Sequence, residues 1–369
     1  MEAYLDNSAT TRAYPEVGDL VYKVMCQDYG NPSSMHRKGV DAEHYVKEAK
    51  ETIAKVLKVN AKDIYFTSGG TESDNLALIG CARANRRAGN HLITTSIEHP
   101  AILNTMRYLE EEEGFRVTYL PVDASGRVNL EALKEALCPE TILVSVMYVN
   151  NEVGTLQPID EAVKIVKEYN SSILFHSDAV QGFGKYHIYP KRQKIDLLSA
   201  SGHKIHGPKG TGFLYVGEKV KIKPILFGGG QQKDLRSGTE NVPGIAGMGK
   251  AAEIAFTTRE YREKEIQQLR DYLIRRLQRG IPYCRLNGSL TNRLPGNCNI
   301  SFQFIEGNEL LLLLDEKNIC ASAASACSTG DTSPSHVLTA MGIPEKLARG
   351  TLRLTIGYQN TQEEIDYTV

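Results

Sequence analysis

Short runs rich in β-branched and aromatic residues alternate with helical patterns between residues 64 and 216, and this alternation constrains the fold most. The runs predicted as strands are residues 64–67, 91–95, 115–120, 142–149, 173–176, 195–199 and 212–216. Apolar residues at helical spacing separate most of these runs. Because strands that alternate with helices build βαβ units, the sequence predicts an α/β fold with a mostly parallel central sheet covered by helices on both faces.

The rest of the chain predicts a second, smaller unit, since 369 residues exceed what one ordinary core holds. A long charged helical pattern would serve as a connector, and the strands after it are separated by longer segments. We therefore expect an N-terminal arm over 1–15 that joins the small domain, a large domain over 16–250, and a small α+β domain over 251–369.

Composition narrows the classes of partner and compartment. The formal net charge is −1, from 43 basic and 44 acidic residues, which gives no support to direct binding of nucleic acid. The beginning of the chain lacks the pattern of a signal peptide, and the longest aliphatic run, 310–314, is too short to cross a bilayer. The seven cysteines are scattered without C-x-x-C or zinc spacing. These features predict a cytoplasmic protein with no membrane contact, no metal and no disulfides.

Polar residues follow several predicted strands, where ligands bind in open α/β sheets. After the first strand comes Ser68-Gly-Gly-Thr-Glu-Ser-Asp-Asn75. A glycine turn that opens a helix can cradle a phosphate, and this one lacks the Walker lysine and the dinucleotide glycine spacing. It therefore suits a single phosphate, and the alternative is a plain helix cap by Thr71.

Other strand ends supply further candidates. His99 could act in acid–base chemistry, stack on an aromatic ligand or be merely structural. A lone buried Asp178 would need a partner such as a ring-nitrogen cation. Lys204 lies in a glycine-rich stretch and could form a Schiff base or be a solvated loop lysine. A phosphate cradle, an acid and a lysine in this order together indicate pyridoxal phosphate (PLP).

Six motifs, which occur in order over nearly the whole chain, resemble a known family. They are Tyr4-Leu-Asp-Asn-Ser-Ala-Thr-Thr11, Asn31-Pro-Ser-Ser34, Ser68-Gly-Gly-Thr-Glu-Ser-Asp-Asn75, Asn150-Asn-Glu-Val-Gly154, Ser201-Gly-His-Lys204 and Arg236-Ser-Gly-Thr-Glu-Asn241. They are similar to those of cysteine desulfurases of the NifS/IscS type, in the class-V aminotransferase superfamily of fold-type I PLP enzymes. The resemblance implies that fold and pyridoxal 5′-phosphate as cofactor.

The resemblance also implies a role for individual residues. Lys204 would carry PLP as a Schiff base and move the substrate Cα proton, while Asp178 would pair with the ring nitrogen. The other cofactor contacts would be His99 stacked on the ring, Asn151 and Gln181 at the ring oxygen, and Gly70, Thr71, Ser201 and His203 at the phosphate. His206 and Lys209 would be structural.

Two further residues would act from a distance in sequence. Arg353 matches the family arginine that grips the substrate carboxylate, with Asn151 beside it, and its alternative is a surface residue on a strand. Thr239 matches a threonine that reaches the phosphate in the neighbouring subunit. The resemblance therefore implies an obligate homodimer.

Cys327 lies in Ala321-Ser-Ala-Ala-Ser-Ala-Cys-Ser-Thr-Gly-Asp-Thr-Ser-Pro-Ser-His336, among small residues without an apolar packing pattern. The segment resembles the catalytic-cysteine loop of the group I desulfurases, although the usual Ser-Gly-Ser-Ala-Cys here reads Ala-Ala-Ser-Ala-Cys. Cys320, seven residues earlier, is a weaker competitor at a strand-like start.

The implied reaction converts L-cysteine to L-alanine and leaves a persulfide on Cys327. A sulfur-acceptor protein would follow, either an iron–sulfur scaffold or a tRNA-thiolation enzyme. The alternatives are a selenocysteine lyase or other class-V PLP aminotransferase, and a protein that has lost catalysis and serves as a scaffold. The presence of Lys204, Asp178 and Cys327 argues against the last.

Overall fold

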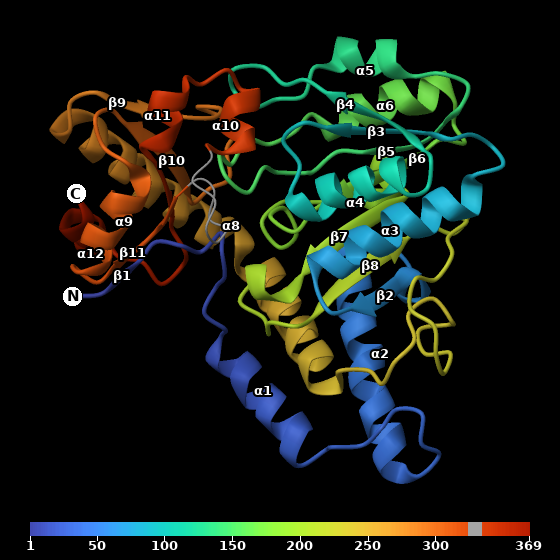
Figure 1. Ribbon diagram of the computed structural model, residues 1–369. Helices are drawn as coiled ribbons and strands as arrows, with labels where there is room; N and C mark the ends of the chain where they lie inside the picture. Colours follow the sequence, from blue (N-terminus) through green and yellow to red (C-terminus); the bar gives the residue numbers. More distant parts are fainter. Residues whose placement is uncertain (324–333) are drawn as a thin grey trace.

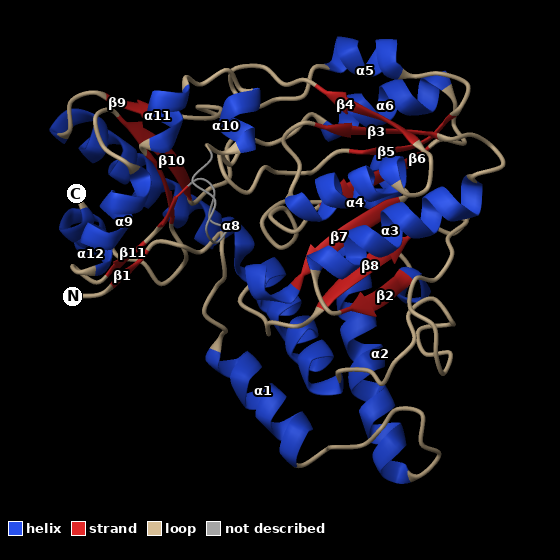
Figure 2. Ribbon diagram, in the orientation of Figure 1, coloured by secondary structure: helices blue, strands red, loops and turns tan. Residues whose placement is uncertain are grey.

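The computed structural model describes residues 1–323 and 334–369, and it is built around a seven-stranded sheet (Figure 2). The strand order is β2-β8-β7-β6-β5-β3-β4. The strands are β2 (Ile64–Thr67), β3 (His91–Thr95), β4 (Arg116–Leu120), β5 (Thr141–Ser145), β6 (Leu174–Asp178), β7 (Leu197–Ser201) and β8 (Gly212–Val216). The pairings among β3 to β7 are parallel, and β8 runs antiparallel to β2 and β7. The predicted mostly parallel sheet is confirmed.

Helices cover both faces of this sheet (Figure 1). They are α1 (Pro15–Cys26), α2 (Arg37–Leu57), α3 (Gly70–Asn85), α4 (Pro100–Glu111), α5 (Leu130–Ala136), α6 (Ile159–Tyr169) and α7 (Pro190–Gln193). Alternate strand residues enter opposite cores: Ile93 packs in the core with α2 and α6, whereas Leu92 packs in the core with α3 and α4. Because both faces are covered, β3, β5, β7 and β8 are buried over their whole length and show no alternation of buried and exposed residues, whereas the edge strand β4 keeps exposed residues.

One strand is shorter than predicted. The apolar run 142–149 suggests a single strand, yet β5 ends at Ser145. The backbone N–H groups of Val146 and Tyr148 still bond to carbonyls of β6 and its end, and Val149 bridges back to Leu156. These residues are buried beyond the ladder, so apolarity alone does not mark where the strand ends.

The second unit is an antiparallel sheet with strand order β12-β13-β10-β9. Its strands are β9 (Cys284–Leu286), β10 (Asn297–Phe302), β12 (Ser322–Ala323) and β13 (Thr351–Thr355), with helices α9 (Gly307–Asp315), α10 (His336–Ala340), α11 (Glu345–Arg349) and α12 (Gln362–Thr368). Strand β1 (Ala3–Tyr4) pairs in parallel with β11 (Ile319–Cys320). The N-terminal arm therefore lies against the second unit, and both termini are found there (Figure 1).

Helix α8 (Val242–Gly280) is continuous over 39 residues and belongs to both units. Its first turns pack with α1 and α2 through Ile245 and Met248, and its later turns pack under the second sheet through Leu273 and Leu277. The predicted boundary at residue 250 falls inside this helix, so the division of the chain there stays a prediction.

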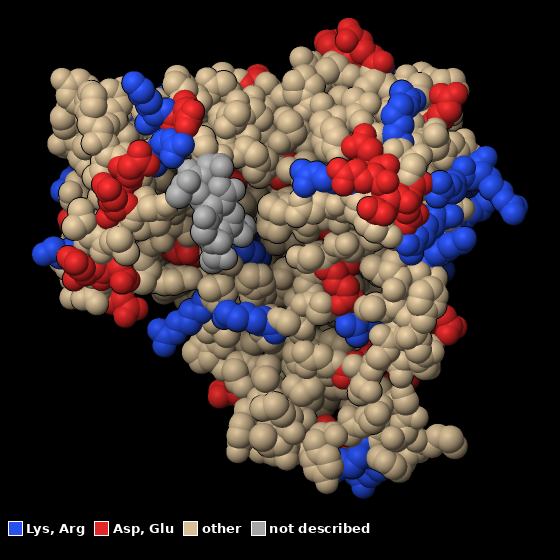
Figure 3. Space-filling model, viewed as in Figure 1, with Lys and Arg blue, Asp and Glu red and all other residues tan. Residues whose placement is uncertain are grey.

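The described residues include no helix that is both long and apolar enough to span a bilayer. Acidic and basic side chains are interspersed over both units on the face shown in Figure 3. The formal net charge of −1 is therefore not the sum of two large single-sign patches on this face.

Candidate active site

A cavity of about 260 Å³ opens at the carboxyl ends of β6 and β7, between the large sheet, the N-terminal arm and β13. It brings together most of the predicted site residues. Those that line it are Gly70, Thr71, His99, Asn151, Asp178, Gln181, Ser201, His203, Lys204 and Arg353. Cavities at this edge of an open α/β sheet are the usual place for ligands in such folds.

Lys204 ends a short 3-10 turn that follows β7. Its Nζ donates to the carbonyl oxygens of Ser8 at 2.5 Å and Ala9 at 2.7 Å. The arm is pinned beside it, because the Thr11 hydroxyl donates to the His203 carbonyl at 2.7 Å. The lysine is therefore held by backbone from the other end of the chain, and the alternative of a solvated loop lysine is wrong.

Asp178 is buried at the end of β6, and its Oδ1 accepts the Val180 N–H at 2.8 Å. Burial raises the pKa of Asp178 to about 6, although the Lys204 charge opposes this shift. A second acid, Asp74 of α3, lines the same cavity. Burial, and then the nearby Asp178 charge, raise the pKa of Asp74 well above its ordinary value. Burial therefore disfavours the charged form of both acids, and a cationic ligand beside Asp178 would favour the ionised form of that carboxyl.

His99 begins helix α4 as its N-cap, where Nδ1 accepts the Ala101 N–H at 3.1 Å. Burial lowers the pKa of His99 to about 4, with smaller contributions from the positive charges of Lys204, His336 and Arg353. The ring is therefore neutral near pH 7, and its proton sits on Nε2 because Nδ1 is an acceptor. His99 is thus both a structural cap and a wall of the cavity.

The phosphate cradle is the start of α3. Gly69 is its N-cap at φ +155°, where a side chain would be strained, and Thr71 lies inside the first turn without capping it. The alternative of a cap by Thr71 is therefore wrong. Gly70 and Thr71 of this helix start line the same cavity as Ser201 and His203, and the first N–H groups of a helix have no partner within it. This end of the cavity therefore provides hydrogen-bond donors that could bind an anion.

Arg353 reaches the cavity from β13 of the second unit and is only 3% exposed. Its Nη1 donates to the Asn151 carbonyl and its Nη2 to Asp6 Oδ1, both at 3.1 Å, while Nε is buried without a hydrogen bond. The alternative of a surface arginine is wrong. The two contacts fix the plane of the guanidinium, as bidentate recognition of a carboxylate requires.

Three predictions fall outside this cavity or outside the described residues. Cys327 lies among residues 324–333, which are not described. Thr239 is exposed and does not line the cavity of its own chain, so its predicted contact with a neighbouring subunit stays a prediction. Cys320, on β11, does not line the cavity either. Arg236 anchors the segment that carries Thr239, because it pairs with Glu72 of α3 at 2.7 Å.

The family profile of class-V aminotransferases matches residues 3–368. The chain belongs to this family. It is 50% identical over 363 residues to cysteine desulfurase IscS of Methanosarcina thermophila. That alignment covers 98% of this chain and 89% of the relative. The solved structure of a NifS-like protein aligns with TM-score 0.94 at 41% identity, over 100% of this chain and 97% of that one. SspA in complex with cysteine aligns with TM-score 0.85 at 36% identity, over 97% and 100% of the two chains.

Sequence patterns do not reveal some polar groups of this member of the class-V aminotransferase family. Asp74 lies within the Ser68–Asn75 motif, yet only the packing of α3 against β6 shows that it meets Asp178. Lys185 follows Gln181 by four residues and donates to its Oε1 at 3.1 Å. The carbonyls of Ser8 and Ala9 carry no side-chain signal at all. These contacts arise between distant segments, which no local pattern encodes.

Proposed function

We propose that this protein is a cysteine desulfurase that takes sulfur from L-cysteine and leaves it as a persulfide on an enzyme thiol. The atoms balance as L-cysteine plus enzyme–SH giving L-alanine plus enzyme–S–SH. One observation carries the proposal most. A lysine amine, a buried acid and a guanidinium with a fixed plane converge on one cavity from separate parts of the chain.

The side chains of this cavity fit PLP. The helix start at Gly70 and Thr71, with Ser201 and His203, would hold its phosphate. Asp178 would pair with a protonated ring nitrogen, which would offset the burial that raises the pKa of this acid to about 6. Lys204 would bind the aldehyde carbon, and Gln181 and Asn151 would contact the ring oxygen. When bound, PLP supplies an electron sink for charge that develops at the substrate Cα.

The chain's own residues would then position the substrate and move its protons. Arg353 binds the carboxylate of cysteine in a forked contact, and Asp6 and Asn151 keep the guanidinium in plane. When the substrate has displaced the Lys204 amine from the aldehyde carbon, this amine takes the Cα proton of the substrate. Neutral His99 offers an Nε2–H on the same cavity wall and can donate a proton there.

Cys327 is proposed as the nucleophile and sulfur carrier. Its thiolate attacks the sulfur of the substrate, a new S–S bond forms, and the Cβ–S bond breaks. The electron pair of the broken bond stays with the carbon skeleton, which gains protons and becomes L-alanine. This assignment rests on the resemblance of the segment around Cys327 to the family's cysteine loop.

We further propose a homodimer in which Thr239 reaches the phosphate site of the partner subunit. The exposure of Thr239 and the Arg236–Glu72 anchor of its segment support this arrangement. The persulfide would pass to an acceptor protein, either an iron–sulfur scaffold or a tRNA-thiolation enzyme. Mass spectrometry of proteins that co-purify with the persulfide form distinguishes these two.

The test uses the purified full chain loaded with PLP. We expect a visible absorbance band, and alanine and sulfide from cysteine in the presence of a reductant. Cys327→Ser should abolish the formation of alanine and sulfide and keep the absorbance band. Cys320→Ser, the matched control, should keep the products and the band. Full activity of the Cys327→Ser variant would refute the assignment of the nucleophile. Wild-type protein that binds no PLP would refute the whole proposal.

A further inference from the structure

Lys185 is a partly buried lysine without a carboxylate partner in the described part of the chain. It follows β6 at the end of a turn. Burial, with the nearby Lys204 charge, lowers the pKa of Lys185 to about 7. Its Nζ makes one side-chain contact, a donation to Gln181 Oε1 at 3.1 Å. Burying a lysine ammonium costs free energy of folding unless the group is paired or hydrogen-bonded.

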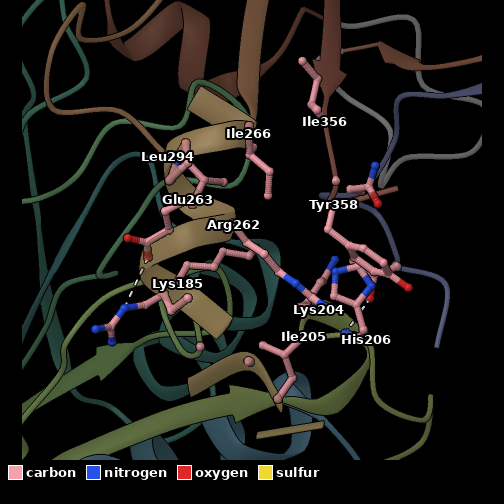
Figure 4. A pocket seen from close by; sticks show the side chains of 18 of the residues that line it. Lys185, Lys204, Ile205, His206, Arg262, Glu263, Ile266, Leu294, Ile356 and Tyr358 are labelled. Carbon is pink, nitrogen blue, oxygen red and sulfur yellow. Dashed lines mark hydrogen bonds and ion pairs between the residues drawn. The ribbon is translucent and has the colours of Figure 1, made fainter. Parts of the chain in front are cut away.

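A second cavity contains the charged side chains that lie near Lys185. Lys185 and Lys204 both line a space of about 90 Å³ between α8, the arm and the end of β13 (Figure 4). The acid that faces this space, Glu263, has Oε1 at 3.7 Å from Arg259 Nε, and this oxygen accepts no hydrogen bond from the residues that the structure describes. The other charged side chain there, Arg262, donates to the Tyr14 hydroxyl. The carboxylate of this cavity therefore has an arginine at ion-pair distance, and Lys185 contacts the amide oxygen of Gln181.

This contact decides which way the Gln181 amide points. Lys185 Nζ is the donor in this contact, so the amide offers its oxygen to Lys185. The amide nitrogen then faces the other way, and it donates to the Ser8 carbonyl at 2.9 Å. Lys204 donates to the same carbonyl. A continuous hydrogen-bond chain therefore runs from Lys185 through Gln181 and Ser8 to Lys204.

We propose that Lys185 is a positioning residue that holds the Gln181 amide with its N–H₂ group toward the cavity. This inference rests on the proposed function and names a specific consequence of it. Gln181 would act as a donor to the ring oxygen of bound PLP, and it could not turn by 180° to present its own oxygen. The ammonium of Lys185 would add positive charge behind that contact.

The main variant is Lys185→Met, which keeps an unbranched side chain one atom shorter and removes its donors. We expect a roughly 2- to 10-fold increase in the dissociation constant of PLP, the scale of one hydrogen bond. We also expect the pH midpoint of the visible absorbance band to rise, because a donor and a positive charge that favour the deprotonated form are removed. Lys185→Arg, which restores both, should recover part of each change. Lys164→Met removes an exposed charge on α6 and should alter neither.

A double-mutant cycle separates positioning from a general loss of stability. Lys185→Met should have its full effect in wild type and almost none in a Gln181→Leu background, because it acts through Gln181. Equal effects in both backgrounds would overturn the inference, as would an unchanged midpoint and affinity in Lys185→Met. If wild-type protein itself fails to bind PLP, the proposed function fails instead, so the two failures are distinguishable. Thermal unfolding of each apoprotein checks that all four proteins fold.

Discussion

Replacing Arg353 with lysine should weaken cysteine binding while leaving the cofactor in place. The side chain is 3% exposed and its guanidinium already serves two acceptors, the Asn151 carbonyl and Asp6 Oδ1, at 3.1 Å each. A lysine ammonium retains the charge but is a single point without the planar fork. It cannot reach both acceptors and also grip a carboxylate with two parallel bonds.

The size of the effect follows from the hydrogen bonding that lysine cannot reproduce. Arg353→Lys removes at least one charge-assisted hydrogen bond to the substrate, worth about 1.5–3 kcal/mol. At about 1.4 kcal/mol per factor of ten, the KM for cysteine should rise roughly 10- to 100-fold. The contacts of PLP proposed above do not include Arg353, so the absorbance band should be unchanged.

The assay is alanine formation as a function of cysteine concentration, with the PLP content measured in the same samples. Arg349→Lys is the matched control, since Arg349 pairs with Glu345 on the surface of a short helix and such pairs contribute a few tenths of a kcal/mol. An Arg353→Lys enzyme with the wild-type KM would refute the assigned contact with the carboxylate. A parallel loss of PLP would show that the arginine holds the cavity together instead.

Three other outcomes follow from the buried charges and the proposed dimer. Asp178→Asn should lower kcat by on the order of 100-fold, whereas Asp74→Asn should change it little, because burial and the Asp178 charge raise the pKa of Asp74 and disfavour its charged form; equal losses in kcat would contradict this ranking. Burial lowers the pKa of His176 to about 3, so the unfolded chain takes up that proton first as the pH falls. Stability should therefore decline from about pH 6.5 down toward pH 3, by about 2 kcal/mol from this group between pH 7 and 5; urea unfolding at these two pH values should show a smaller decline for His176→Gln. Thr239→Ala should weaken PLP binding without changing the sedimentation of the dimer, and a monomeric wild-type protein would contradict the shared site.

The sequence is a good guide to this fold because its strands are buried on both faces and separated by clear helical patterns. The end of β5 could not be predicted, since residues beyond Ser145 stay apolar and buried after the ladder stops. The choice between a cap and a cradle at Thr71 depends on the position of Gly69 as N-cap. That position is set by backbone geometry, which the residue types alone do not fix.

The residues of the candidate site likewise include some that the sequence predicts and some that it does not. Lys204, Asp178 and His99 follow strand ends and were predictable as a set from topology. The partners that tune them were not, because Asp74, Lys185 and the Ser8 carbonyl meet the site through contacts between distant segments. Arg353 is ambiguous in sequence because a charged residue on a buried strand has the same local pattern as one on a surface strand. Its contact with Asp6 requires the first and last parts of the chain together.

The path of the N-terminal arm has a consequence for the order in which the protein matures. Thr355 donates its backbone N–H to the Leu5 carbonyl at 2.6 Å and accepts the N–H of Asn7 at 3.2 Å. The residues that hold Lys204 are thus secured by a strand that leaves the ribosome long after them. Contacts between such distant segments form late. A nascent chain that stops before β13 should build the large sheet yet be unable to retain the proposed cofactor, so loading would wait until β13 has been made.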